Sequence, residues 1–223
     1  RFTAYSKVAG GVVHAVTDDL EAIGAGDYND ADGEIVIPEP KKVKLPKFVA
    51  SAIEAAYPDG WTSGTVVLID KLDRVDWTTV GGLRENLLRN FGVTYHKLRN
   101  SVAIYVGDTY CEPIDPLFLT PDFRFYDLEG DDDRAHSFEP LEIEIKDPKT
   151  RQPVGNMVVR LAYMPPTFGS IDKRKDAVKK NAKERFAIIK EYHGILFSRM
   201  GRLIGAEMKS PFTVFQNNDR YIK

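Results

Sequence analysis

The chain has 223 residues, of which 43 % are apolar and 29 % charged, with a formal net charge of −2. These values are typical of a soluble globular protein with one large domain or two small ones. They exclude a global electrostatic attraction to nucleic acid or acidic lipid, so any such role must be local. No apolar run approaches the roughly 20 residues of a membrane helix, so no membrane partner is expected.

The few features that bear on location favour the cytoplasm. The single cysteine, Cys111, cannot form an internal disulfide, which favours a reducing compartment. The first ten residues carry Arg1 and Lys7 with no apolar core between them, so no signal peptide is visible. Because the first residue is Arg1 and not Met, we interpret the chain as a fragment of a longer protein.

The first third of the chain predicts hairpins, loops and one short helix. Glycine pairs and prolines mark the ends of these elements, and apolar spacing sets their type. In chain order we expect a hairpin of strands 2–6 and 12–16, an extended continuation over 18–23, a polar loop over 24–33, a strand over 34–37, a helix over 46–57 and a strand over 65–72.

The remaining two thirds predict longer helices that alternate with strands, without internal repeats. We expect a helix capped by Asp76 and ended by Gly92, in which Gly92 serves as the stop signal. After it we expect a hairpin of strands 101–106 and 109–112, a loop over 121–136, a hairpin of strands 141–145 and 157–163, a helix over 173–192 that buries Val178, Ala182, Phe186 and Ile189, a strand over 194–204 and a last strand over 212–222.

Two acidic segments are candidate cation sites. The loop from Tyr28 to Gly33 has part of the spacing of an EF-hand, but Tyr28 occupies the first ligand position and Pro38 and Pro40 forbid the exit helix. The acidic run over 129–133 could also hold a hard cation. The alternative for both segments is a solvated loop, which is the far commoner role of such charge runs.

The histidines and the cysteine offer no chemistry of their own. The four histidines have no metal-ligand spacing, and Cys111 has no nearby basic residue to activate it. Neither a Walker loop nor a dinucleotide fingerprint is present. We therefore assign no catalytic residue and no metal ligand.

The strongest basic cluster lies on the helix expected after Ser170. It could contact a phosphate backbone, or it could be the solvated face of an amphipathic helix. Its members are Lys173, Arg174, Lys175, Lys179, Lys180, Lys183 and Arg185.

The strand that begins at Gly64-Thr65 carries a resemblance to a known family. A Gly-Thr pair, four apolar residues, a charged break and an amphipathic helix resemble the end of the ATP-binding domain of the GHKL group, which includes gyrase B, MutL and MORC proteins. In this group the dipeptide opens a strand at the floor of the adenine pocket. Glycine lets the backbone approach the ligand, and the threonine hydroxyl can hydrogen-bond the purine, often through water.

Three further segments resemble the MORC-like members of this group, in the same order along the chain. Residues 1–20 are similar to the segment after the glycine-rich ATP lid, and 101–108 to the first hairpin of the adjoining transducer domain. Residues 197–204 resemble the transducer strand in which MORC proteins carry Asn-Arg-Leu-Ile. The helix with the catalytic glutamate, the Asp-x-Gly-x-Gly motif and the lid are not in this sequence, and we expect them before Arg1.

The resemblance implies an α+β fold. Residues 1–74 would form the C-terminal part of a Bergerat-type α/β sandwich, the GHKL ATP-binding domain, and 75–223 a ribosomal-protein-like transducer domain. The parent protein would be an ATPase that binds ATP with Mg²⁺ and whose lid closure promotes homodimerisation. Within this chain the implied cofactor contacts are Gly64 and Thr65.

The residues also leave a second hypothesis of a different class. The chain could be a non-enzymatic α+β interaction module that binds nucleic acid or protein through the basic helix at 173–185. Its contacts to DNA or to a protein partner would then be Lys173, Arg174, Lys179, Lys180 and Lys183.

Overall fold

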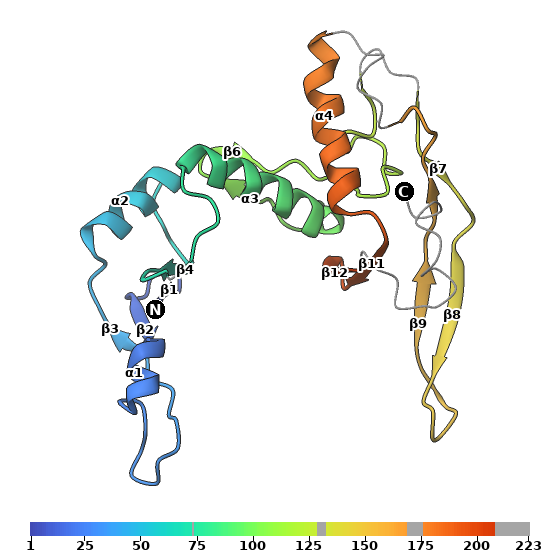
Figure 1. Cartoon of the computed structure of the whole chain (residues 1–223). Helices are drawn as coiled ribbons and strands as arrows, with labels where there is room; N and C mark the ends of the chain where they lie inside the picture. Colours follow the sequence, from blue (N-terminus) through green and yellow to red (C-terminus); the bar gives the residue numbers. More distant parts are fainter. Residues whose placement is uncertain (73, 129–132, 169–175, 208–223) are drawn as a thin grey trace. The chain divides into compact units, whose positions relative to one another are not determined.

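The computed structural model describes residues 1–72, 74–128, 133–168 and 176–207, with side chains outside 176–181. The chain divides into two compact units, Arg1–Val80 (unit 1) and Gly81–Lys223 (unit 2). Helices and small antiparallel sheets occur in both, which confirms the predicted α+β class. Figure 1 shows these elements along the chain.

Unit 1 is built on one antiparallel sheet in the order β3-β2-β1-β4. The central strand β1 pairs with β2 on one edge and with β4 on the other, so β4 forms one edge of this sheet. The predicted hairpin and the strand at Gly64 are therefore confirmed, with shifted ends. The strands are β1 Phe2–Lys7, β2 His14–Asp18, β3 Lys41–Lys42 and β4 Gly64–Ile69.

One face of this sheet is covered by helix α2, Lys47–Ala56. Its buried residues Val49 and Ile53 are four positions apart and pack against Tyr5 of β1. The helix predicted over 46–57 is thus confirmed. The opposite face carries exposed apolar residues of cross-strand neighbours, Phe2, Val67 and Ile69.

Residues Leu20–Ala25 form a short helix, α1, where the sequence predicted a continued strand. Asp19 caps it by accepting a hydrogen bond from the Glu21 amide at 3.2 Å, and Gly26 ends it in the left-handed conformation. The strand predicted over 34–37 is also wrong, because only a single bridge joins Asn29 and Ile35.

Unit 2 contains two longer helices and several two-stranded sheets. The long hairpin of β8 and β9 is the largest of these ribbons (Figure 1). The elements from α3 onward are α3 Val80–Thr94, the 3-10 turn η1 His96–Leu98, β5 Tyr105–Val106, β6 Thr109–Tyr110, β7 His136–Ser137, β8 Leu141–Lys146, β9 Pro153–Val159, β10 Ala162–Tyr163, α4 Asp176–Glu191, β11 Ile195–Arg199 and β12 Arg202–Glu207.

Helix α3 begins later and ends later than predicted, at Val80 rather than Asp76 and at Thr94 rather than Gly92. Gly92 is buried, and a Cβ there would lie 2.7 Å from the carbonyl oxygen of Glu112. The glycine therefore permits close packing of the helix against the chain around Glu112, and it is no stop signal.

The core of unit 2 joins α3, the irregular segment 111–128 and α4. Asp115 lies inside it with only 2 % of its surface exposed. Its carboxylate accepts hydrogen bonds from the amides of Leu117 and Leu119 and, at 2.7 Å, from the hydroxyl of Thr120. The buried apolar residues are Val93, Ile114, Phe118, Phe125, Leu128, Phe168, Ala182 and Ile188.

The buried face of α4 differs from the predicted one. Ala182 is buried as expected, but Phe186 is 44 % exposed and Arg185 is fully buried. The Arg185 guanidinium lies 3.8 Å from the centre of the Phe168 ring and donates to the Phe168 carbonyl oxygen at 2.7 Å. This stacking places an arginine where the apolar pattern predicted a solvated face.

The strand predicted over 194–204 is in fact a hairpin of β11 and β12. Met200 and Gly201 form its turn, both with positive φ. A Cβ on Gly201 would lie 2.6 Å from Cδ2 of Leu98, so this turn packs tightly on η1. The strand predicted over 212–222 lies outside the described residues.

Replacing Asp115 by Ala is expected to destabilise unit 2 by about 3 kcal/mol, because two amides and one hydroxyl lose a buried acceptor. Urea unfolding can be followed by labelling Cys111, which is buried in unit 2 and is the chain's only cysteine. Asp108→Ala is the control, since the Asp108 side chain is 89 % exposed. Equal stability of the two variants would contradict a structural role for Asp115.

Candidate functional site

The Gly64-Thr65 pair lies at the start of edge strand β4, as the sequence predicted. Gly64 has a φ of 130°, a conformation that other residues rarely adopt. A Cβ at this position would also lie 3.2 Å from Nε1 of Trp61. Backbone conformation and the neighbouring indole therefore both favour glycine here.

The register of β1 with β4 brings Ser6 beside Thr65. Their hydroxyl oxygens are 3.2 Å apart, and the Ser6 hydroxyl lies 3.4 Å from the Gly64 carbonyl oxygen. Thr65 is exposed. The edge thus presents two adjacent hydroxyl groups that can each donate and accept.

Lys7 and Trp61 lie at the same end of the sheet but on its α2 side, where Trp61 packs against the buried cluster of Tyr5, Val49 and Ile53. The Lys7 ammonium donates to the Trp61 carbonyl oxygen at 3.2 Å and lies 5.9 Å from the centre of its ring. Sequence reasoning missed Ser6, Lys7 and Trp61. The signal for Ser6 and Lys7 was available only in the strand pairing, which places Ser6 opposite Thr65, 59 positions away, and Lys7 opposite Gly64.

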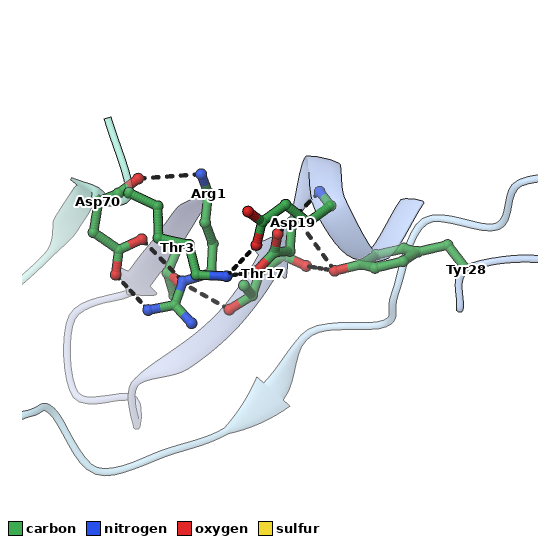
Figure 2. Close-up of polar contacts among 8 residues, drawn as sticks. Arg1, Thr3, Thr17, Asp19, Tyr28 and Asp70 are labelled. Atoms are coloured by element: carbon green, nitrogen blue, oxygen red, sulfur yellow. Dashed lines mark hydrogen bonds and ion pairs between the residues drawn. The ribbon is translucent and has the colours of Figure 1, made fainter. Parts of the chain in front are cut away.

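The other end of β4 carries a network of ion pairs and hydrogen bonds (Figure 2). Arg1 binds both carboxylate oxygens of Asp70, with its Nε 2.9 Å from Oδ1. The hydroxyl oxygens of Thr3 in β1 and Thr17 in β2 lie 2.9 Å apart and share a hydrogen bond. Side-chain contacts therefore stabilise this end of the sheet in addition to the backbone hydrogen bonds between its strands.

Asp19 and Tyr28 extend this network to α1. The Tyr28 hydroxyl donates to the Thr17 carbonyl oxygen at 2.8 Å and accepts from the Asp19 amide at 3.2 Å (Figure 2). Lys71 bridges Asp19 at 3.2 Å and Glu21 at 2.7 Å. Arg1 and Lys71 already bind carboxylates of this chain. We therefore interpret the network as one that stabilises the fold rather than as a ligand site.

These contacts shift the pKa values of the charged groups. The hydrogen bond from Arg1 lowers the pKa of Asp70. Desolvation acts to raise the pKa of Asp19, but hydrogen bonds from Lys71 and from the Glu21 amide outweigh it and lower that pKa. The pKa of Lys71 is raised by its hydrogen bonds to Glu21 and Asp19.

The acidic segments show no metal site among the described residues. Asp30 closes the 28–33 loop itself, because its side chain accepts from the amides of Asp32 at 2.9 Å and Glu34 at 3.0 Å. No cluster of three His, Cys, Asp or Glu side chains that could hold a metal occurs in the described parts of the chain. Of the acidic run, residues 129–132 lie outside those parts.

The basic cluster can be followed only in part. Lys173 and Arg174 lie outside the described residues, and the side chains of Lys179 and Lys180 are likewise not described. Lys183 is exposed on α4, whereas Arg185 is buried. Arg185 therefore does not belong to a surface cluster.

Cys111 has a structural environment. Its thiol is buried and donates to the Leu88 carbonyl oxygen at 3.1 Å, and burial raises its pKa. A thiol that stays protonated is a poor nucleophile.

Comparison with known proteins gives no relatives. No family model, no curated protein and no solved structure matches the chain. Within the described residues, none of the helices has the length and apolar character needed to cross a membrane.

Replacing Lys71 by Met is expected to raise the pKa of Asp19 toward the ordinary value of about 3.9, because the lowering hydrogen bond is lost. Asp70 should keep its lowered pKa, since Arg1 is its main partner. NMR titration of the carboxyl carbons measures both values.

The pH dependence of stability follows from the sign of the shift. A carboxyl group with a lowered pKa stabilises the fold above its ordinary pKa, and this contribution is lost as the pH falls. The stability difference between wild type and Lys71→Met should therefore shrink below about pH 4. Lys44→Met is the control for loss of an exposed lysine; an unshifted Asp19 in Lys71→Met would refute the bridge.

Proposed function

We propose that the chain is the later part of a GHKL-type ATPase, with the end of the ATP-binding domain over 1–74 and a transducer domain over 75–223. The parent protein binds ATP with Mg²⁺ in the cytoplasm. Nucleotide binding closes its lid and shifts the transducer toward a dimeric state, because ATP contacts the closed state better than the open one.

The observation that carries this proposal is the geometry at Gly64-Thr65. Glycine leaves the backbone accessible at the start of β4, and the exposed Thr65 hydroxyl stands beside that of Ser6. Such a pair of hydroxyl groups suits the purine edge, which offers both donors and acceptors. The indole Nε1 of Trp61 lies 3.2 Å from where a Cβ of Gly64 would stand, so glycine fits best at the start of β4.

The uncovered parts of unit 1 also support the proposal. Strand β4 is hydrogen-bonded to β1 alone among the described strands, so its other edge can accept a further strand. On the face opposite α2, Phe2, Val67 and Ile69 are 41 %, 55 % and 61 % exposed. Exposed apolar groups side by side on a sheet indicate a surface that another layer covers.

The reaction class of the proposed parent protein is hydrolysis of the terminal phosphate of ATP. In the GHKL group an upstream glutamate activates water and an asparagine holds magnesium, and neither motif occurs in this sequence. The role proposed for this chain is therefore adenine-side binding and coupling to the transducer. No catalytic residue is assigned to it.

In the full-length protein, Thr65→Ala is expected to weaken ATP binding by about 1 kcal/mol, because one hydrogen bond to the purine is lost. This corresponds to about a fivefold increase in Kd. Isothermal titration calorimetry with ATP and Mg²⁺ measures it.

Thr62→Ala provides the matched control, since Thr62 is exposed in the loop before β4 and outside the proposed contact. Its Kd should equal that of the wild type. Unchanged affinity in Thr65→Ala would remove Thr65 from the site. No Mg²⁺-dependent ATP binding by the wild-type protein would refute the proposed function itself.

A further inference from the structure

Unit 2 contains a cavity of about 380 Å³ whose lining is unusually basic. Three segments far apart in the sequence form it. Its lining residues are His96, Lys97, Arg99 and Asn100 after α3, then Thr120, Pro121 and Phe123, and Arg160 between β9 and β10. Lys97, Arg99 and Arg160 all contribute to its wall. The volume falls in the range of pockets that hold small ligands.

No carboxylate balances these three cations in the described lining. Within the part of the chain that the structure describes, none of them lies within 4.0 Å of an Asp or Glu oxygen. Four other arginines of unit 2 each have a carboxylate partner: Arg84, Arg89, Arg124 and Arg134. The cavity therefore concentrates positive charge, because its described lining carries three cations and no carboxylate.

Two of the three cations, Arg99 and Lys97, have uncharged partners. The Arg99 guanidinium lies 5.0 Å from the centre of the Phe123 ring, and His96 meets the same ring edge-on at 6.3 Å. Lys97 donates to the Ser198 hydroxyl at 3.4 Å, in the hairpin that packs on η1. Stacking on an aromatic ring leaves the N–H groups at the edge of a guanidinium able to bind an oxyanion.

The nearest buried acid does not compete for these donors. Asp115 is 2 % exposed, and both its oxygens already accept hydrogen bonds from Leu117, Leu119 and Thr120. The Thr120 hydroxyl contributes to the cavity wall while it donates to Asp115. An anion in the cavity would thus face the cations and the Phe123 ring.

We propose that this cavity binds the phosphate group of a phosphorylated ligand, with Arg99 and Arg160 as its principal ligands and Lys97 as a supporting charge. A planar guanidinium can donate two parallel hydrogen bonds to two oxygens of one phosphate. The Phe123 ring offers an apolar surface to the rest of the ligand. The phosphate can come from a small phosphorylated molecule or from the backbone of a nucleic acid. The site is independent of the proposed ATP site, because all of its residues lie in unit 2.

The first experiment titrates the 223-residue chain with inorganic phosphate at low ionic strength. Amide NMR shifts are expected at Arg99, Asn100, Phe123 and Arg160, with saturation. The variant that combines Arg99→Gln and Arg160→Gln should bind about tenfold more weakly or worse, since two charge-assisted contacts are lost. Dispersed amide spectra of the variant show that it remains folded.

Arg151→Gln is the matched control, because Arg151 is exposed in the turn between β8 and β9. It should bind phosphate like the wild type. An equal loss in this control, or no saturable shifts at the cavity residues of the wild type, would overturn the proposal.

Two further arms distinguish the sources of the phosphate. A fluorescein-labelled single-stranded oligonucleotide that binds the wild type, is displaced by phosphate and loses affinity in the double variant identifies a nucleic-acid backbone. A nucleoside monophosphate that binds more tightly than inorganic phosphate, with no oligonucleotide binding, identifies a small ligand. Oligonucleotide binding that is unchanged in the double variant would contradict the backbone arm.

Discussion

The antiparallel register of β1 with its two neighbours fixes nearly every feature of unit 1. The same alignment that places Ser6 opposite Thr65 places Phe2 opposite Ile69 and leads Arg1 to Asp70. Because side chains alternate between the two faces, a slip of one residue would move Tyr5 from the α2 side to the uncovered side. The hydroxyl pair, the core and the ion-pair network therefore depend on one arrangement of backbone hydrogen bonds.

In unit 2 the corresponding constraint is the burial of charged groups among apolar ones. Asp115 stays inside because its carboxylate accepts three hydrogen bonds, and Arg185 because it stacks on Phe168 and donates to that residue's carbonyl oxygen. Each group organises a segment without regular structure, around 115–120 and near 168. Such contacts can hold loops in a core where helices and strands are short.

The elements that the sequence predicts well are those with clear apolar periodicity. Helix α2 and strand β4 are examples, since Val49, Ile53, Val66 and Leu68 follow the spacing of their element. Helix α1 was missed because it has only six residues and depends on the Asp19 cap. Gly92 was misread as a stop signal because its close contact with Glu112 is tertiary.

The sites show the same division between local and long-range information. Gly64 and Thr65 can be singled out from the sequence because they are adjacent, but the contact of Thr65 with Ser6 requires the strand pairing. The basic helix can likewise be identified from the sequence, because its lysine and arginine residues are close together along the chain. The cavity cations were missed because Arg99 and Arg160 are far apart in the sequence and only the fold brings them together.

The most direct test of the proposed nucleotide edge is hydrogen exchange of the full-length protein with and without ATP and Mg²⁺. Our account predicts slower exchange in peptides that cover the start of β4, around Gly64 and Thr65, and in the paired end of β1 at Ser6 and Lys7. Nucleotide-dependent protection elsewhere in the protein, with unchanged exchange in these two segments, would contradict it.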